Sequence, residues 1–349
     1  MSETTTLTPT CLITVDGSRL DTAHEGALAD VTVHDRLNSV STCSLLFNSA
    51  ASKLLDTSVF SLESELIVKL GYKDALEEVF SGDVVALKAL FSEWDGEQLE
   101  ITGASALHRL CHGARVRHFE KKTLSERVKG IITGYALKAD VDSFGAASDF
   151  TAQAGENDYD YVLRAAALYG KQVFAHGATI FIKDEVTPRS DEIVYEWGKN
   201  LTALEATQDI RRILSRVECV GWDAQQGAAF NGSAALSDLA VKIGGSKDVT
   251  ALCKGGGAWT ETRVNLSLKY RDDAKSQAKG ILQSNSFLLS AATGSGEGNP
   301  KLRPGMRVTL KNVGKAFEGE YLADAVTHRL SENGGYTTSF TLKRNKCGG

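Results

Sequence analysis

Short runs of alternating apolar and polar side chains fill the first third of this 349-residue chain. They are rich in β-branched residues, a composition typical of strands that bury one face. The turns between them depend on glycine and small polar residues, as at Asp16-Gly17 and Asp95-Gly96. Strands of this number and spacing indicate a barrel or a sandwich. They are predicted at residues 11–16, 29–36, 40–47, 64–71, 79–91 and 97–103.

The pattern changes near residue 112, where apolar residues take up helical spacing. Thr123 and Glu126 form a capping box, because each side chain can bind a free backbone N–H at a helix start. The sequence therefore predicts a helix that begins after Thr123. Its apolar positions are Leu124, Val128, Ile131, Ile132 and Tyr135.

A second helix is predicted from about Asp158 to Tyr169, capped by Asn157 or Asp158 and closed by Gly170. The next residues, 171–184, alternate again and predict a hairpin with its turn at His176-Gly177. These elements together predict a compact α/β unit.

Strand patterns return in the second half of the chain. They predict strands at 201–210 and 213–223, then a mixed segment with a glycine run at 255–257 and a helix near 271–283. Gly294, Gly296 and Gly298 predict a flexible loop. Further strands are predicted at 306–313, 319–330 and 335–344, with a hairpin turn at 333–335.

Composition is that of an ordinary soluble globular protein, with 42% hydrophobic and 24% charged residues. A formal net charge of -5 gives no global positive field, so we expect no nucleic-acid specificity. No apolar run approaches the ~18 residues that span a bilayer, and residues 1–10 lack the features of a secretory signal. We therefore expect a protein made in a cytoplasm that does not insert into a membrane by itself.

The six cysteines are widely spaced and form no CxxC pair, which argues against a zinc ribbon or a redox motif. In a reducing cytoplasm we expect free, buried thiols, because unpaired cysteine behaves as a small hydrophobe. They are Cys11, Cys43, Cys111, Cys219, Cys253 and Cys347.

The best metal candidate is the group His108, Cys111 and His112, with His118 further on. Two histidines at i and i+4 share a helix face, and a thiol could add a third ligand. The segment is basic, however, and no glutamate follows His108 as a zincin requires. We therefore expect a solvated basic linker that binds no structural metal.

Other catalytic motifs are weak. The glycines at 294, 296 and 298 lack the spacing of a nucleotide-binding loop, and no GxSxG elbow is present. Asp158 and Asp160 fall in the first turn of a helix, where the macrodipole favours negative charge. We expect them to stabilise that helix. No catalytic, cofactor-binding or metal-binding residue is assigned, and no cofactor is expected.

Four blocks near the C-terminus form a specific pattern. Residues 300–310 read PKLRPGMRVTL, 317–321 read FEGEY, 327–328 read TH and 335–340 read GYTTSF. Their order resembles the last β-domain of the phage late control D family, which includes the hub portion of VgrG spike proteins. Residues 217–223 (VECVGWD) and 150–182 are similar to further blocks of that family, the latter in divergent form. The resemblance covers roughly residues 10–345.

The matching residues also have physical roles. Pro304-Gly305 forms a sharp turn, and we expect Gly305 to have a positive φ. In the last strand Tyr336, Thr338 and Phe340 share the buried face. Trp222 faces away from Val217, Cys219 and Gly221, so it is expected to fill the barrel core or to anchor a neighbouring subunit.

The resemblance implies a mainly β fold with an α/β insert (α+β): two related tail-tube-like β-barrel domains plus smaller α/β domains. The first barrel is expected at 10–111, the α/β insert at 112–200, the second barrel at 201–225 and 299–345, and a mixed insert at 226–298. The family's hubs are trimers whose paired barrels form a pseudo-sixfold ring. One face of the ring continues the inner tube, and the other holds a spike.

The implied partners are two further copies of the chain, an inner tube protein, a separate spike protein of VgrG or OB-fold type, and other baseplate proteins. The chain would then be a structural component of an assembled tail or injection particle. It is not expected to be an enzyme. Two alternatives remain open: a tail-associated cell-wall hydrolase, and a receptor-binding or glycan-binding tail protein.

Overall fold

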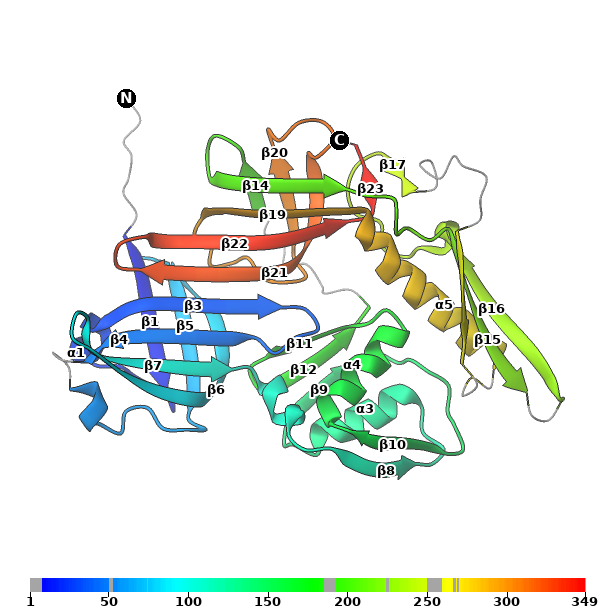
Figure 1. The fold of residues 1–349 in the computed structure, drawn as a ribbon, viewed down its shortest axis with the longest axis horizontal. Coiled ribbons are helices and arrows are strands. Elements are labelled where there is room, and N and C mark those ends of the chain that lie inside the picture. Colours follow the sequence, from blue (N-terminus) through cyan, green and yellow to red (C-terminus); the bar gives the residue numbers. More distant parts are fainter. Residues whose placement is uncertain are drawn as a thin grey trace.

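The computed structural model describes residues 8–348, apart from 50–52, 74, 185–192, 224–225, 250–258, 266–267 and 269. The described chain is mainly β with few helices, as the sequence predicts. Figure 1 shows one broad sheet, with an α/β insert at one end of its strands. No helix in the described ranges is long and apolar enough to cross a membrane. The glycine run at 255–257 and Cys253 lie outside the described residues.

Seven strands form the first half of the sheet, in the order β3-β4-β7-β6-β5-β1-β2. Their apolar positions face a common core, where Val31, Leu45 and Ile101 are wholly buried. The elements are β1 (Pro9–Val15), β2 (Ser18–Arg19), α1 (Thr22–Gly26), β3 (Leu28–Arg36), β4 (Thr42–Asn48), η1 (Leu54–Asp56), β5 (Glu65–Tyr72), β6 (Ala75–Ser92) and β7 (Gly96–Ala104).

Six strands form the second half, in which β14-β19-β22-β21 are neighbours and β20 pairs with β21 and β13. As predicted, Tyr336, Thr338 and Phe340 share the buried face of β22. The strands are β13 (Ile193–Glu196), β14 (Leu201–Gln208), β19 (Ser290–Glu297), β20 (Arg307–Lys311), β21 (Gly319–Ser331) and β22 (Gly335–Arg344).

The two halves are joined edge to edge, because β21 also pairs with β3. The result is one sheet that runs as an open path from β14 to β2 in the described part of the chain. The tail-tube-like β-rich fold predicted from the sequence is therefore present. Hydrogen bonding within the described residues does not close either half into a barrel, because strands at both ends of the path keep a free edge.

The loop predicted at residues 294–298 is wrong, because β19 runs through Gly294 and Gly296. These glycines serve close packing. An added Cβ at Gly294 would lie 2.9 Å from the Phe340 ring, and one at Gly296 would lie 2.7 Å from the Tyr195 ring. The strand thus needs residues without side chains beneath these two aromatic rings.

The α/β insert contains both predicted helices and the predicted hairpin. Thr123 and Glu126 form the capping box of α3, and the Asn157 side chain caps α4. The β11–β12 hairpin turns after His176 and extends a three-stranded sheet in the order β11-β12-β9. The elements are η2 (Ala106–Cys111), β8 (Arg115–Phe119), α3 (Leu124–Thr133), β9 (Lys138–Val141), β10 (Thr151–Glu156), α4 (Asp158–Leu168), β11 (Gln172–His176) and β12 (Thr179–Lys183).

A last unit packs the predicted helix α5 against a separate small sheet, β16-β15-β18. A Cβ at Gly232 would lie 2.2 Å from the Lys275 backbone N, so glycine lets the helix lie against β16. Residues 201–225 are therefore divided, with β14 in the large sheet and β15 in the small one. The elements are β15 (Arg216–Asp223), β16 (Ala228–Ala235), η3 (Leu236–Asp238), β17 (Lys247–Asp248), β18 (Thr260–Val264), α5 (Arg271–Ser286), η5 (Phe287–Leu289) and β23 (Lys346–Cys347).

The described cysteines are free thiols. Cys43, Cys219 and Cys347 are buried, as predicted, whereas Cys11 and Cys111 are partly buried. Burial raises the pKa of the Cys11 thiol to about 12, and burial also raises the pKa of the Cys43 thiol well above its usual value. Both thiols are therefore protonated and unreactive near neutral pH.

Candidate functional site

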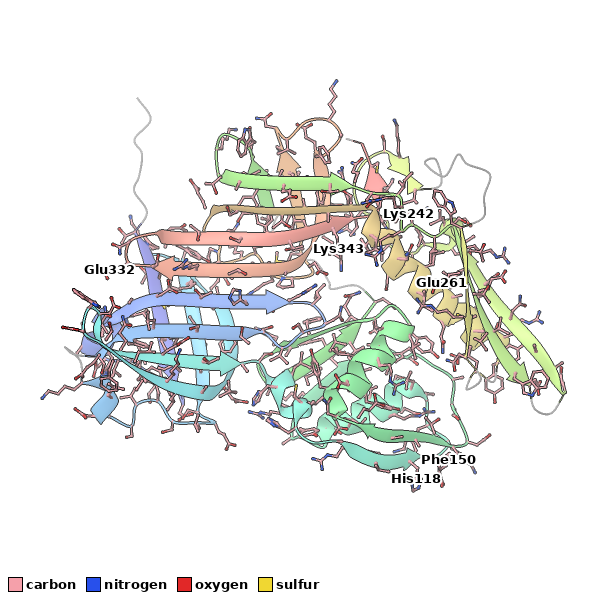
Figure 2. All side chains as sticks on the ribbon, in the orientation of Figure 1. His118, Phe150, Lys242, Glu261, Glu332 and Lys343 are labelled. Atoms are coloured by element: carbon pink, nitrogen blue, oxygen red, sulfur yellow. The ribbon has the colours of Figure 1, made fainter. Side chains whose placement is uncertain are left out.

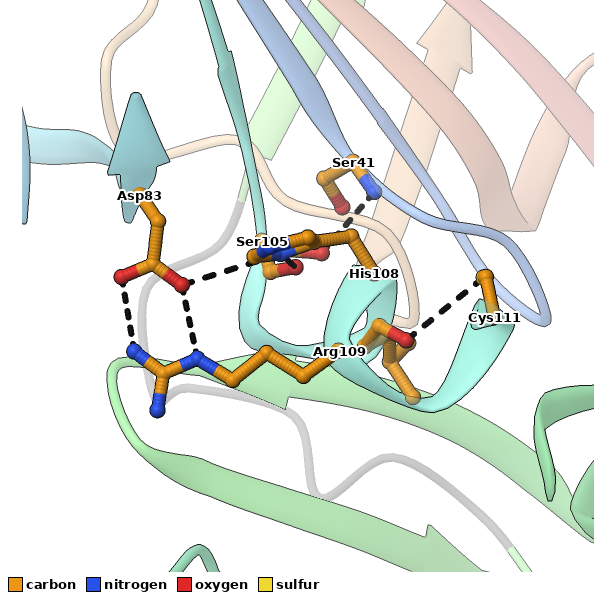
Figure 3. A network of polar contacts seen from close by, with 7 residues as sticks. Ser41, Asp83, Ser105, His108, Arg109 and Cys111 are labelled. Atoms are coloured by element: carbon orange, nitrogen blue, oxygen red, sulfur yellow. Dashed lines mark hydrogen bonds and ion pairs between the residues drawn. The ribbon is translucent and has the colours of Figure 1, made fainter. Parts of the chain in front are cut away.

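The predicted metal group lies on and beside η2, where ordinary polar contacts hold its residues (Figure 3). Asp83 accepts two hydrogen bonds of 2.7 Å from the Arg109 guanidinium. His108 Nδ1 lies 3.0 Å from the Ser105 carbonyl oxygen and 3.7 Å from Asp83 Oδ2. Figure 3 places Cys111 on the other side of the helical turn, where its Sγ contacts the carbonyl oxygen of Leu107.

The segment is not a solvated linker, and that prediction is wrong. Ala106, Leu107 and Leu110 are buried in the core of the insert, so η2 attaches the first half of the sheet to the insert. Across the described ranges no three His, Cys, Asp or Glu side chains lie together in a way that could hold a metal ion.

Asp158, which the sequence predicts to stabilise the first turn of its helix, is also the centre of a buried cluster of hydrogen bonds, called here the clasp around Asp158. It accepts hydrogen bonds from Arg117 on β8, from Gln153 at 2.8 Å and from the Tyr135 hydroxyl at 2.8 Å. Burial alone raises the pKa of the Asp158 carboxyl, but these hydrogen bonds outweigh burial and lower it. An ionised carboxylate tied to three partners joins β8, β10 and the helices and is not poised to transfer a proton.

A second buried titratable group is His328 on β21. Its Nε2–H donates to the Leu302 carbonyl oxygen at 3.0 Å, and its Nδ1 accepts from the Tyr336 hydroxyl at 2.9 Å. Burial lowers the pKa of His328 to about 3, so the ring is neutral and both nitrogens are occupied. The arrangement fixes the T-H and G-Y strands of the sequence motif to each other.

A cavity of about 390 Å³ lies where the first half, the insert and the second half meet. Stacked rings of Phe174 and Phe181 belong to its lining. Its charged groups contact neighbouring groups: His176 Nδ1 lies 3.7 Å from Glu78, and Arg303 donates to the Val79 carbonyl oxygen at 2.5 Å. Among its described lining residues, the Ser41 hydroxyl donates to Asp35 at 2.6 Å, and the Ser41 backbone N–H donates to the Ser105 hydroxyl at 3.1 Å.

The more distinctive surfaces are the edges of the sheet. Residues 85–92 of β6 lie beside β7 on one side, and the described residues provide no strand partner on the other, because β5 pairs only with residues 75–83 and Val84 bonds the backbone of Glu63 and Ser64. Among the described residues β19 is the one strand that pairs with β14, and beyond it Leu201 forms only an isolated bridge with Trp197. These two edges bound a continuous run of eight strands, β14-β19-β22-β21-β3-β4-β7-β6. Free edges of this length invite pairing with another chain.

Large apolar side chains lie along the free part of β6. Leu87 is 40% exposed, Phe91 is 71% exposed, and Trp94 at the hairpin tip is 91% exposed. The sequence pattern predicts the strand β6 but does not by itself indicate that its edge is free. The sequence signal for this edge is a run of apolar residues at every second position, Leu87, Ala89 and Phe91. This run lies beyond the residues of β6 that pair with β5.

The face of the eight strands that turns away from the core carries mainly small hydroxyl side chains. Several of its charged groups form ion pairs, such as Arg329 with Asp30 at 2.9 Å and Lys88 with Glu100 at 3.2 Å. The hydroxyl side chains include Thr32, Ser44, Thr102, Thr293, Thr327 and Ser339.

Trp222 lies half exposed on β15, so its predicted place in a barrel core is wrong. Val217, Cys219 and Gly221 form the buried face of the strand, which packs towards α5. Trp222 is therefore available on the outer face of the small sheet.

The chain matches one family model by sequence and resembles several solved structures in fold. A family model described as "Alg8 N-terminal domain" matches residues 5–332. No curated protein matches the chain by sequence.

Three solved structures with a similar fold are described as tail proteins or as a secretion-system component. The 43 kDa tail protein of prophage MuSo2 from Shewanella oneidensis is 13% identical with a TM-score of 0.69, covering 97% of this chain and 98% of that chain. The tail protein from Neisseria meningitidis MC58 is 12% identical with a TM-score of 0.67, covering 97% of each. An E. coli component of the type VI secretion system is 13% identical with a TM-score of 0.62, covering 95% of this chain and 76% of that one. The chain shares its fold with these proteins.

Proposed function

The chain belongs to the Alg8 N-terminal domain family, and we propose that it is a structural hub at the centre of a contractile tail or a related injection machine. In this role three copies form a ring that joins the hexameric inner tube to a separate trimeric spike. The likeness in fold to tail proteins over nearly the whole of each chain supports the proposal.

The observation that carries it is the run of eight strands with a free edge at each end. Every neighbouring pair in this run is antiparallel. Because the number of strands is even, β14 and β6 run in opposite directions. The β14 of one copy would therefore lie antiparallel beside the β6 of the next, and the alternation would continue across the joint.

A head-to-tail contact of this kind generates a ring when the rotation closes. Three copies would bring three such runs into one closed sheet and would leave no free edge. The face with hydroxyl side chains and paired charges would then line the central channel, since the apolar core lies on the other face. Such a lining offers few unpaired charges or apolar side chains to hold a passing polymer.

The two ends of the strands differ, and the proposal assigns them different partners. The turns between β6 and β7 and between β21 and β22 lie at one end, marked by Glu332 in Figure 2. The insert, marked by His118 and Phe150, lies towards the other end. The end with short turns would stack on the inner tube, and the end with the insert would hold the spike and other baseplate proteins.

We assign no catalytic role. The buried titratable groups Asp158 and His328 are held by structural hydrogen bonds. This arrangement fits a structural component of an assembled particle. We propose that the component is made in the cytoplasm and needs no cofactor.

Light scattering of the purified chain, with and without the spike protein, tests the proposal. The expected result is a mass of three chains that becomes more stable when the spike is added. Contacts of this kind typically bury more than ~1,000 Å² per interface. A chain that remains a stable monomer with the spike present would contradict it, as would turnover of peptidoglycan or glycan binding by the monomer.

A further inference from the structure

We propose that the joint between copies pairs residues 86–92 of β6 with β14 of the next copy, in the register with which β21 pairs with β3 inside one chain. This inference rests on the proposed ring. It names the residues that meet at the joint.

The first support is a match between two hairpins. In β21–β22, Ser331 is opposite Gly335, and in β6–β7, Ser92 is opposite Gly96. Each hairpin also has one bulge, at the same distance from its turn: between Ala323 and Ala325 in β21, and between Val84 and Ala86 in β6. Each long strand pairs with a preceding strand through its first part, β20 in one case and β5 in the other. Strand β6 is therefore the equivalent of β21.

A second pair of hairpin partners matches in the same way. Strands β3 and β4 shift register between Leu28 and Asp30, and β14 and β19 shift between Leu201 and Ala203. Neighbouring pairings agree, since β4 pairs with β7 as β19 pairs with β22. Strand β14 is therefore the equivalent of β3. Because bulges fix register, agreement at both bulges makes the correspondence specific to single residues.

The contact between β21 and β3 then serves as the template for the missing one. Inside the chain, Leu330 is opposite Val31 and His328 is opposite Val33. Replacing each residue by its equivalent puts Phe91 opposite Leu204 and Ala89 opposite Ala206. These residues share the apolar side of the sheet in both partners.

The two equivalent strands, β21 and β6, differ in how far their apolar side chains are buried, as this template requires. Val326 is 1% exposed, because the neighbouring half covers β21. Its equivalent in β6, Leu87, is 40% exposed, and Phe91, the equivalent of the partly buried Leu330, is 71% exposed. The described residues contain no further half to cover this row, so a second copy is the occupant that fits it.

The polar side of the joint is also complementary. The same register puts Lys88 opposite Thr207, with Glu205 diagonal to it on the same face. Diagonal side chains of this length are within reach across antiparallel strands. A Lys88–Glu205 contact between copies would add to the Lys88–Glu100 pair within one copy.

Disulfide trapping tests the register. The variant with Ala89→Cys and Ala206→Cys is expected to form covalent dimers and trimers under mild oxidation, seen on a non-reducing gel. The matched control, Ala89→Cys with Leu204→Cys, is displaced by two residues on the same face and is expected to cross-link at least tenfold less. Each single variant is run as well, because the native cysteines remain in all of them.

Light scattering on the same samples separates the two proposals. If the chain forms a trimer but the displaced pair links as well as the matched pair, or neither pair links, the register is wrong and the hub stands. If the chain is a monomer and neither pair links, both proposals fail. Circular dichroism of each variant confirms that the cysteine substitutions leave the fold intact.

Discussion

Trp222 and Cys219 lie on opposite faces of β15, as the alternation of the strand predicts. Alternation alone does not tell which face meets a core. That depends on α5, which follows much later in the chain and packs against the side with Cys219. Spacing in the sequence is likewise an incomplete guide to contacts. His108 and Cys111 have the spacing of metal ligands, but in the fold His108 contacts the Ser105 carbonyl oxygen and Cys111 contacts that of Leu107.

The exposed position of Trp222 predicts a split between stability and assembly. Trp222→Ala should lower the free energy of unfolding by about 1–3 kcal/mol, less than for a fully buried tryptophan, because about half of the residue is already exposed. Assembly with spike and tube should weaken more than tenfold if Trp222 anchors a partner. Urea denaturation and pull-down of the particle measure the two effects, with Trp222→Phe as the control that retains an aromatic ring. A large loss of stability with normal assembly would refute this role.

The clasp around Asp158 predicts a cost for removing its cation. Arg117→Ala leaves a buried carboxylate short of a partner, and should destabilise the fold by roughly 2–3 kcal/mol. This is less than for a fully buried pair, because the Arg117 side chain is 34% exposed. Arg216→Ala, which breaks the more exposed pair with Glu218, should cost under about 1 kcal/mol. Equal effects of the two substitutions in urea denaturation would contradict the clasp.

His328 predicts a dependence of stability on pH. The unfolded chain binds a proton at this ring near pH 6.5, whereas burial lowers the folded pKa to about 3. The contribution of the neutral ring is complete above pH 6.5 and is lost as pH falls towards 3, by about 1.4 kcal/mol per unit. Urea denaturation over this range should show a shallower loss in His328→Gln than in the unchanged chain. Identical slopes would rule out this assignment.

At the scale of elements, local signals predicted well where the cause is local. The capping box at Thr123 and the Asn157 cap mark helix starts, because the residues that satisfy the backbone are neighbours in sequence. Gly294 and Gly296 led to a wrong prediction of a loop, because glycine is needed there to make room for two aromatic rings from distant strands. A glycine that permits close packing and a glycine in a flexible loop look alike in sequence.

Gly305 is a local case that the sequence predicted correctly. Its φ is +84°, and its N–H donates to the Ala323 carbonyl oxygen at 2.7 Å. Gly305→Val should cost about 1–3 kcal/mol, because a β-branched residue is strained at positive φ. Gly26→Ala is the control, since its added Cβ meets no atom within 4 Å and it lacks a positive φ. Thermal denaturation in which both variants melt alike would contradict the strained turn.

At the scale of the whole molecule, the joint between β21 and β3 organises the sheet. It connects segments almost 300 residues apart, as the Arg329–Asp30 pair with a separation of 299 shows. Strand patterns predicted each partner but not their pairing, because an edge contact of this kind leaves no periodic signal. The matching bulges in the two halves cannot be recognised from the sequence either, because the two halves have few identical residues at equivalent positions.

Electron cryo-microscopy of the assembled particle tests the central claim most directly. The proposed hub predicts three copies of this chain in one ring between tube and spike, with unbroken sheet hydrogen bonding from β6 of each copy to β14 of the next. A chain found as a monomer at the periphery of the particle, or a ring in which these edges stay apart, would contradict it.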